Sequence, residues 1–217
     1  MKIFGAEAWS GFIDVEHFVG SILDVVLEGW PRIVAPNPDE LEDPVTNRLV
    51  AQIQRSESFR KLPLRVYPRA IELNEDGTVS GIPDIRFETN APQHIGEFFV
   101  FECKRLRFKS GERCKSGNSE YIDGKTQGMT AFVAGKYATP YGHGGMLGYV
   151  LCDCANPVPT LERAIKQSTV LALEAGDGLR PSSLRSHVDI RETFHHPQVG
   201  SDFRLHHIFL DSKRCRG

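Results

Sequence analysis

The sequence predicts an α/β (α+β) protein: a three-layer sandwich with a central mixed β-sheet flanked by helices. Three observations lead to this prediction. Apolar residues recur at helical spacing early in the chain, short strand-like runs separated by turn signals fill the middle, and strand and helix patterns alternate afterwards. This order favours one mixed sheet with helices packed on both of its faces.

The two leading helices are predicted from the spacing of their apolar residues. Residues 14–29 form an apolar face at helical spacing, and Gly29 suits a C-cap. A connector rich in proline follows. A second helix then begins around Pro44, capped by Asp43 or a near neighbour, and runs to about Ser56.

The middle of the chain predicts a strand meander. Residues 64–73 and 78–88 are apolar and β-branched, and they flank the turn signal "NEDG", which ends in Asp-Gly. These two runs are expected to pair as a hairpin. The strongly apolar run "GEFFVFECKRL", at 96–106, is the next strand.

Two segments of different character follow this strand. Residues 107–119 are polar and basic, which predicts a surface loop. Residues 120–138 predict a helix, which Gly124 and Gly128 weaken because glycine has low helix propensity.

The last part of the chain predicts two strands around one helix. Residues 144–153 read as a buried strand, and 160–176 as an amphipathic helix ending at Gly176. Residues 203–211, "FRLHHIFLD", give a final strand.

The composition bounds the kind of protein. The chain has 217 residues, 40% hydrophobic and 25% charged, which fits one domain with a sizeable core. The net charge is −2 and the pI is about 6.4, so the chain lacks the global basicity of many nucleic-acid binders. A polyanionic partner would therefore be held by a local basic patch.

The cysteines and the apolar runs indicate the compartment. The five cysteines are odd in number and scattered, which favours a reducing cytoplasm. The N-terminus has acidic and polar residues where a signal peptide needs an apolar core, and no run approaches a membrane span. We expect a cytoplasmic protein with no membrane partner.

Charged residues interrupt two of the predicted strands. Because side chains alternate along a strand, Glu102 and Lys104 share one face, and pairing with the neighbouring strand would bring Asp84 to them. Carboxylates on a half-buried strand cost desolvation energy unless they are paired or bind a cation. Oxygen ligands on a rigid strand suit Mg²⁺. The alternative is an exposed salt bridge between two surface strands.

The pattern Pro83-Asp84, a hairpin loop, then Glu102-Cys103-Lys104 resembles the PD-(D/E)xK nuclease superfamily, which has the restriction-endonuclease-like fold. The resemblance covers about 40–155 of a single 1–217 domain, with N-terminal helical and C-terminal strand and helix decorations. It implies a DNA endonuclease that hydrolyses phosphodiester bonds with Mg²⁺, for which Mn²⁺ substitutes. Asp84 and Glu102 would bind the metal, and Lys104 would assist the attacking water.

The resemblance also implies residues from the two flanking helices. A further metal ligand often comes from the preceding helix, where Glu42 has the right spacing and Glu40 competes with it. A polar residue from the following helix would be Gln127 or Lys125. The chain departs from the RecB-like branch, because Ala131 stands where that branch has tyrosine.

A basic run follows the Glu102–Lys104 strand. It would line a groove for backbone phosphates, giving affinity that falls with salt and carries no sequence information. A solvated loop is the equally simple interpretation. The residues are Arg105, Arg107, Lys109, Arg113 and Lys115, together with Lys125 and Gln127 from the next helix.

Partners follow only by analogy. The fold would suit an effector nuclease of a bacterial defence assembly, a homodimer that cuts both strands, or a non-catalytic subunit that binds nucleic acid or protein. Full binding without metal and without cleavage would favour the last of these.

Two other patterns suggest sites of a different kind. Cys152 and Cys154 would form a zinc site with His206 and His207, but Cys-x-Cys lacks the usual gap and structural burial is favoured. A terminal strand would send one histidine of each His-His pair inward and the other outward. The glycine-rich segment 135–150 lacks the Gly-Lys-Ser/Thr ending of a phosphate loop.

Overall fold

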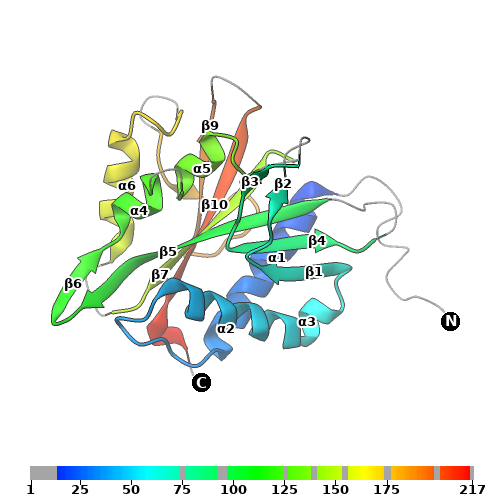
Figure 1. The fold of residues 1–217 in the computed structure, drawn as a ribbon, viewed down its shortest axis with the longest axis horizontal. Coiled ribbons are helices and arrows are strands. Elements are labelled where there is room, and N and C mark those ends of the chain that lie inside the picture. The colour runs from blue at the N-terminus through cyan, green and yellow to red at the C-terminus, as the bar shows by residue number, and fades with distance from the viewer. Residues whose placement is uncertain are drawn as a thin grey trace.

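The computed structural model describes residues 14–73, 77–91, 97–124, 127–137, 141–152, 156–173, 177–197 and 201–215 (Figure 1). Lys125, Cys154 and residues 174–176, which were named above, lie outside these ranges.

One mixed sheet forms the centre of the protein. In the described residues it has eight strands in the order β1-β4-β5-β7-β10-β9-β8, and β6 pairs with β5 off this path. Strands β5, β7 and β10 are parallel, and the other pairings are antiparallel. The bounds are β1 Leu64–Pro68, β4 Ile85–Thr89, β5 Phe98–Ser110, β6 Arg113–Ser116, β7 His143–Val150, β8 Arg180–Pro181, β9 Ile190–His195 and β10 Phe203–Asp211.

Helices cover both faces of this sheet, as predicted. One core contains the apolar faces of α1, α2 and α3 (Val15–Gly29, Glu42–Arg55 and Glu57–Arg60). The other contains those of α4, α5 and α6 (Asn118–Asp123, Met129–Val133 and Pro157–Gln167). In Figure 1, α1 passes behind the strands and α4, α5 and α6 lie together on the left. The arrangement is the predicted mixed sheet between helical layers.

The two leading helices form where the sequence predicts them, with different ends. Gly29 is not a C-cap, because it keeps helical dihedral angles and the chain continues into a 3₁₀ turn at Trp30–Arg32. Helix α2 begins at Glu42 rather than Pro44, after Leu41, which makes no side-chain cap. The proline is tolerated because N–H groups of the first turn have no helical partner. The earlier start places Glu42 in the first turn.

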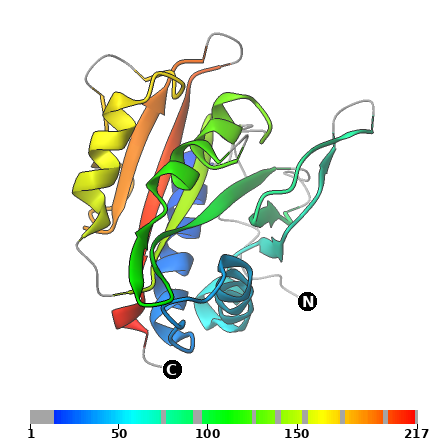
Figure 2. The same ribbon diagram turned by 60° about the vertical axis from the view of Figure 1, so that its left-hand side comes forward.

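The predicted hairpin is broken into two parts. Residues 69–71 and 82–84 separate β1 and β4 from a small pair, β2 (Glu72–Leu73) and β3 (Val79–Gly81). This pair projects from the sheet on the right of Figure 2. At the break, Arg69 has a positive φ of 51° and its N–H donates to the Asp84 carbonyl. Asp84 therefore lies in the bend before β4 and not inside a strand.

The segment predicted as a loop at 107–119 is a hairpin instead. Strand β5 continues to Ser110, and β6 returns along it after a turn at residues 111–112. Gly111 has a φ of 61°, which suits the tight turn. The polar composition concealed a strand because β6 is exposed along its whole length.

Two predicted helices are shorter than expected. Helix 120–138 is divided into α4 and α5, since Gly128 has a φ of 67°. Helix α6 ends at Gln167 rather than 176, and the chain after it contains Ala172 with a φ of 49°. The Ala172 carbonyl accepts from the His196 N–H at 2.7 Å, so this segment is held beside the end of β9. That contact cannot be read from local periodicity.

Strands β8 and β9 were not predicted, and β9 changes the environment of β10. It pairs along β10 on the side opposite β7, so β10 is internal to the sheet and covered on both faces. His206 and His207 are both fully buried. The expectation that one of them would face outward is wrong, because it assumed a terminal strand with one solvated face.

Buried polar groups form a hydrogen-bonded chain between β9, β10 and α4. The hydroxyl of Tyr121 lies 2.9 Å from His207 Nδ1, and His207 Nε2 lies 2.9 Å from Thr193 Oγ1. The chain continues from Thr193 Oγ1 to His195 Nε2 at 2.7 Å and from His195 Nδ1 to the Leu171 carbonyl at 2.6 Å. We refer to these residues as the histidine chain. If both imidazoles are neutral, every ring nitrogen of His195 and His207 has a hydrogen-bond partner, and the hydrogen bonds determine which nitrogen of each ring carries the proton.

The cysteines differ from the expected set of reduced thiols. Cys114 is disulfide-bonded, whereas Cys103 and Cys215 carry free thiols. The sulfur atoms of Cys114 and Cys152 are 3.7 Å apart. No group of three His, Cys, Asp or Glu side chains suited to a metal was found in the described part of the chain, and the rings of His206 and His207 bond to other side chains.

Candidate active site

A gap along one edge of β5 forms the floor of the site. Strand β4 pairs with β5 as far as Phe101, and β6 pairs with the same edge from Arg107 onward. Between these two partners the edge of β5 is open. A cavity of about 460 Å³ lies here, lined by the start of α2, the bend before β4, β3 and the segment around residue 137.

Lys104 is at the centre of this cavity. Its Nζ lies 2.7 Å from Glu102 Oε1, 3.3 Å from Glu42 Oε1 and 3.9 Å from Asp84 Oδ2. The ammonium also donates to the carbonyl of Cys103 at 2.9 Å. Glu102 and Lys104 lie on the face of β5 opposite Cys103, as the alternation of strand side chains predicts. The structure thus brings the four predicted residues together.

Glu102 is held on three sides. Besides Lys104, its carboxylate accepts from the Tyr137 hydroxyl at 2.8 Å and from the Gly128 N–H at 3.4 Å. The residue is only 2% exposed. A side chain at Gly128 would lie 2.5 Å from the Tyr121 carbonyl, so this approach requires glycine. Sequence reasoning missed Tyr137, because no local pattern links it to a carboxylate 35 residues earlier.

The Asp84 side chain binds to the backbone of β5 at its open edge. Its Oδ2 accepts from the Cys103 N–H at 2.7 Å, the place that a ladder partner would otherwise fill. Burial, then the charge of Glu102, raises the pKa of Asp84 to about 7, although Lys104 and the Cys103 N–H act in the opposite direction. The carboxylate is thus incompletely compensated.

The structure distinguishes Glu42 from Glu40. Burial raises the pKa of Glu42 above its ordinary value, with Lys104 offsetting part of the effect. Glu40 is turned away, because its two oxygens accept from Arg48 at 2.6 and 2.9 Å. Arg48 lowers the pKa of Glu40. Only Glu42 reaches the cavity.

The charges of the cavity centre do not balance. Burial alone would lower the pKa of Lys104, but attraction from Glu102, Glu42 and Asp84 outweighs it, so the pKa is raised and the ammonium stays charged. One ammonium faces three carboxylates, and a divalent cation would offset the excess. Mg²⁺ needs only one or two carboxylates and completes its shell with water and phosphate oxygens. The two oxygen-donor side chains Asp84 and Glu102 fit that requirement, although the described residues contain no group of three His, Cys, Asp or Glu side chains arranged for a metal ion.

The predicted phosphate-binding residues are divided by the structure. Lys109, Arg113 and Lys115 are exposed on the β5–β6 hairpin. Arg105 donates to the Glu40 carbonyl at 3.2 Å and lies over the ring of Phe108.

Arg107 is a structural residue, so its assignment to a phosphate groove is wrong. It is 7% exposed and donates to Ser116, Asn118 and Thr160. Gln127 is exposed and lines the carboxylate cavity, as expected of a polar residue from this region.

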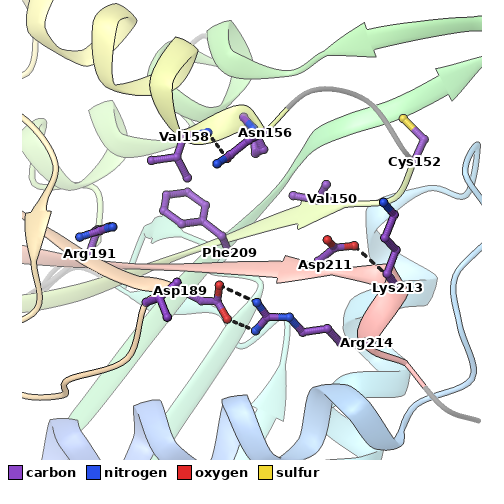
Figure 3. A pocket seen from close by; sticks show the side chains of 12 residues that line it. Val150, Cys152, Asn156, Val158, Asp189, Arg191, Phe209, Asp211, Lys213 and Arg214 are labelled. Atoms are coloured by element: carbon purple, nitrogen blue, oxygen red, sulfur yellow. Dashed lines mark hydrogen bonds and ion pairs between the residues drawn. The ribbon is translucent and has the colours of Figure 1, made fainter.

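A second cavity, of about 430 Å³, lies at the start of α6 (Figure 3). Its lining contains three basic residues, of which Arg214 is paired through both guanidinium nitrogens with Asp189; the others are Arg191 and Lys213. Two of the first three residues of α6 are prolines, and the Val158 N–H between them donates to Asn156. The first turn therefore offers few donors to a ligand, and we assign no function to this cavity.

Comparisons with protein-family models, curated proteins and solved structures gave no match to this chain. Among the residues described, no helix has the length and apolar character that crossing a membrane requires.

Replacing Tyr137 with Phe is expected to lower the free energy of unfolding by about 2 kcal/mol, because one oxygen of a buried carboxylate loses its donor. Urea unfolding at neutral pH measures this effect. Tyr67→Phe, which removes an exposed hydroxyl, is the matched control and should change stability by less than about 0.5 kcal/mol. Equal stability of both variants would contradict a role for Tyr137 in holding Glu102.

Proposed function

We propose that the protein is a metal-dependent nuclease of restriction-endonuclease-like fold, acting on DNA as an endonuclease. The observation that carries the proposal is the convergence of Glu42, Asp84 and Glu102 on the Lys104 ammonium in one cavity. A charge-balanced structural cluster would not need three carboxylates around one buried cation. The order of the elements also agrees with the resemblance: a helix bearing Glu42, the bend bearing Asp84, then the Glu-x-Lys strand.

The residues have distinct roles in this proposal. Asp84 and Glu102 would hold Mg²⁺ or Mn²⁺, and Glu42 would support them. The bound cation would polarise the scissile phosphate and lower the pKa of the attacking water. Tyr137 and Gly128 fix Glu102, so the ligand position is organised before substrate arrives.

Lys104 acts as a charge and not as a base. Its raised pKa keeps the amine protonated at neutral pH, so it cannot accept the proton of the attacking water. The ammonium instead orients that water by donation and offsets the negative charge that develops on the phosphate. Gln127 lines the cavity and would contact the same phosphate.

The direct test is cleavage of supercoiled plasmid with Mg²⁺, Mn²⁺ or EDTA. We expect nicking or linearisation with either cation and none with EDTA. Calorimetric titration of Mg²⁺ into wild type and Asp84→Asn gives a second readout that does not depend on turnover. Binding of nucleic acid without cleavage in any cation would instead favour a non-catalytic subunit of a larger assembly.

A matched pair of acidic residues tests the assignment of Glu42. Glu42→Gln should reduce the cleavage rate by about 10²-fold, because it removes a carboxylate from the cavity. Glu40→Gln affects only contacts outside the cavity, the ion pair with Arg48 and the hydrogen bond from the Asn37 N–H, so it should leave cleavage unchanged and lower stability by about 1 kcal/mol. The reverse pattern in the two rate measurements would show that Glu40 is the functional residue.

A further inference from the structure

A groove outside the carboxylate cavity follows the free edge of β1. It has a volume of about 350 Å³ and lies between β1 and the helices α2 and α3. Its polar lining includes Arg60, Arg65, Tyr67 and Asn90. We refer to it as the β1 groove.

The β1 groove is positively charged and has no carboxylate in its lining. Arg60 and Arg65 are exposed, and neither guanidinium group forms a hydrogen bond or ion pair with another described residue. The acidic residue opposite Arg65 in β4 is Glu88, which pairs with Arg86 at 2.7 Å. Two uncompensated guanidinium groups in one groove favour an anionic partner.

An aromatic ring is exposed beside these charges. Tyr67 is 37% exposed and lies on the same side of β1 as Arg65, two residues away. An exposed ring next to free arginines is the combination on which unpaired bases stack while their phosphates are bound. In a duplex the base faces stack on one another and are not available to such a ring.

The edge of β1 is unsuited to a peptide strand. The Val66 carbonyl already accepts from the Gln54 side chain at 3.1 Å, and Pro68 has no N–H to donate. Addition of a strand needs these main-chain groups. The groove therefore favours a polynucleotide over an extended polypeptide.

The β1 groove and the carboxylate cavity are neighbours along the chain, because Tyr67 lines the groove and Arg69 lines the cavity. Arg69 follows β1 directly, lines the cavity and donates its N–H to the Asp84 carbonyl. At the rise of a β-strand, Arg65 is about 13 Å from Arg69 along the chain. A strand held at Arg65 and Tyr67 would reach the carboxylates within a few nucleotides.

We propose that the β1 groove binds a single-stranded polynucleotide, with phosphates at Arg60 and Arg65 and a base stacked on Tyr67, and delivers it to the carboxylate cavity. This inference rests on the proposed function for the fate of the strand, but the binding itself does not require cleavage. It replaces the β5–β6 hairpin as the main nucleic-acid surface.

The test is fluorescence anisotropy of labelled oligo(dT) with EDTA present, so that no cleavage occurs. The double variant Arg60→Gln/Arg65→Gln should raise Kd at least about tenfold and reduce the salt slope by about 1.4, since each lost phosphate contact on a single strand accounts for about 0.7. Tyr67→Leu should raise Kd about tenfold with little change in salt slope. The matched control is Arg113→Gln/Lys115→Gln on the β6 strand, with no change expected.

The outcomes separate this inference from the proposed function. The proposed role of the β1 groove would be overturned if its variants bound oligo(dT) with wild-type affinity or if the control variant lost as much affinity. It would also be overturned if the wild type bound duplex more tightly than oligo(dT), or bound no oligo(dT). If the groove variants still cleave plasmid and bind oligo(dT) as the wild type does, the single-strand proposal is rejected and the nuclease proposal stands. If oligo(dT) binding depends on the groove residues but no cation supports cleavage, the single-strand proposal stands and the nuclease proposal is rejected. Urea midpoints confirm that each variant is folded.

Discussion

Replacing Lys104 with Met is expected to reduce metal-dependent cleavage about 10³-fold, because the ammonium that faces the carboxylates is lost from the reaction centre. Methionine fills much of the same volume without the charge. The measurement is the single-turnover cleavage rate at saturating Mg²⁺, taken at a temperature where the variant is folded.

Stability should fall in the same variant. The buried Glu102 loses its nearest cation, and breaking a buried ion pair costs about 3 kcal/mol. Lys109→Met is the control, since Lys109 lies on the same strand and is exposed. It should change neither property by a measurable amount. Cleavage by Lys104→Met at the rate of the control would remove Lys104 from the mechanism.

Acid should unfold the protein through its buried imidazoles. Burial lowers the pKa of His195 from 6.5 to about 4 and that of His207 from 6.5 to about 3. Below pH 6.5 the unfolded chain therefore binds protons that the folded chain excludes. The stability is complete above the unfolded pKa and is lost as the pH falls from 6.5 towards 4, by roughly 3 kcal/mol for each imidazole.

The histidine chain explains why this loss is steep. Protonating either ring places a charge in the core and leaves one hydroxyl hydrogen, of Tyr121 or Thr193, without an acceptor. His206, on the other face of β10, is also buried with a lowered pKa and adds to the same slope.

Urea unfolding at a series of pH values between neutral and 4.5 measures this dependence. His195→Gln should flatten the slope of stability against pH below 6.5, even if it lowers stability at neutral pH. The exposed His17 provides the control, and His17→Gln should leave the slope unchanged. A flat stability profile in the wild type would contradict the predicted acid sensitivity.

The centre of the site was predictable because its key residues are close in sequence. Glu102 and Lys104 are fixed on one face by strand alternation, and Asp84 precedes the strand that pairs with theirs. The choice between Glu42 and Glu40 was open because it depends on Arg48, one helical turn beyond the predicted cap. Periodicity carries no information about such a pair.

The parts that sequence reasoning missed depend on contacts between distant segments. Tyr137 reaches Glu102 only because Gly128 breaks the predicted helix and turns the chain back over the site. Arg107 appeared as one more cation in a basic run, but the hairpin encloses it among polar partners. The β1 groove could not be predicted, because Arg60 and Arg65 come from different elements and do not form a continuous basic run in the sequence.

The divided edge of β5 has a consequence for how the chain tolerates changes in length. Strand β5 pairs with β4 at one end, with β6 at the other and with β7 along its opposite side. Deleting Cys103 would turn the side chains beyond that point to the opposite face. Lys104 would then enter the apolar core beneath α2, and the carboxylates would lose their common partner. Substitutions here act one side chain at a time, whereas a single-codon deletion or insertion would dismantle the whole site in one step.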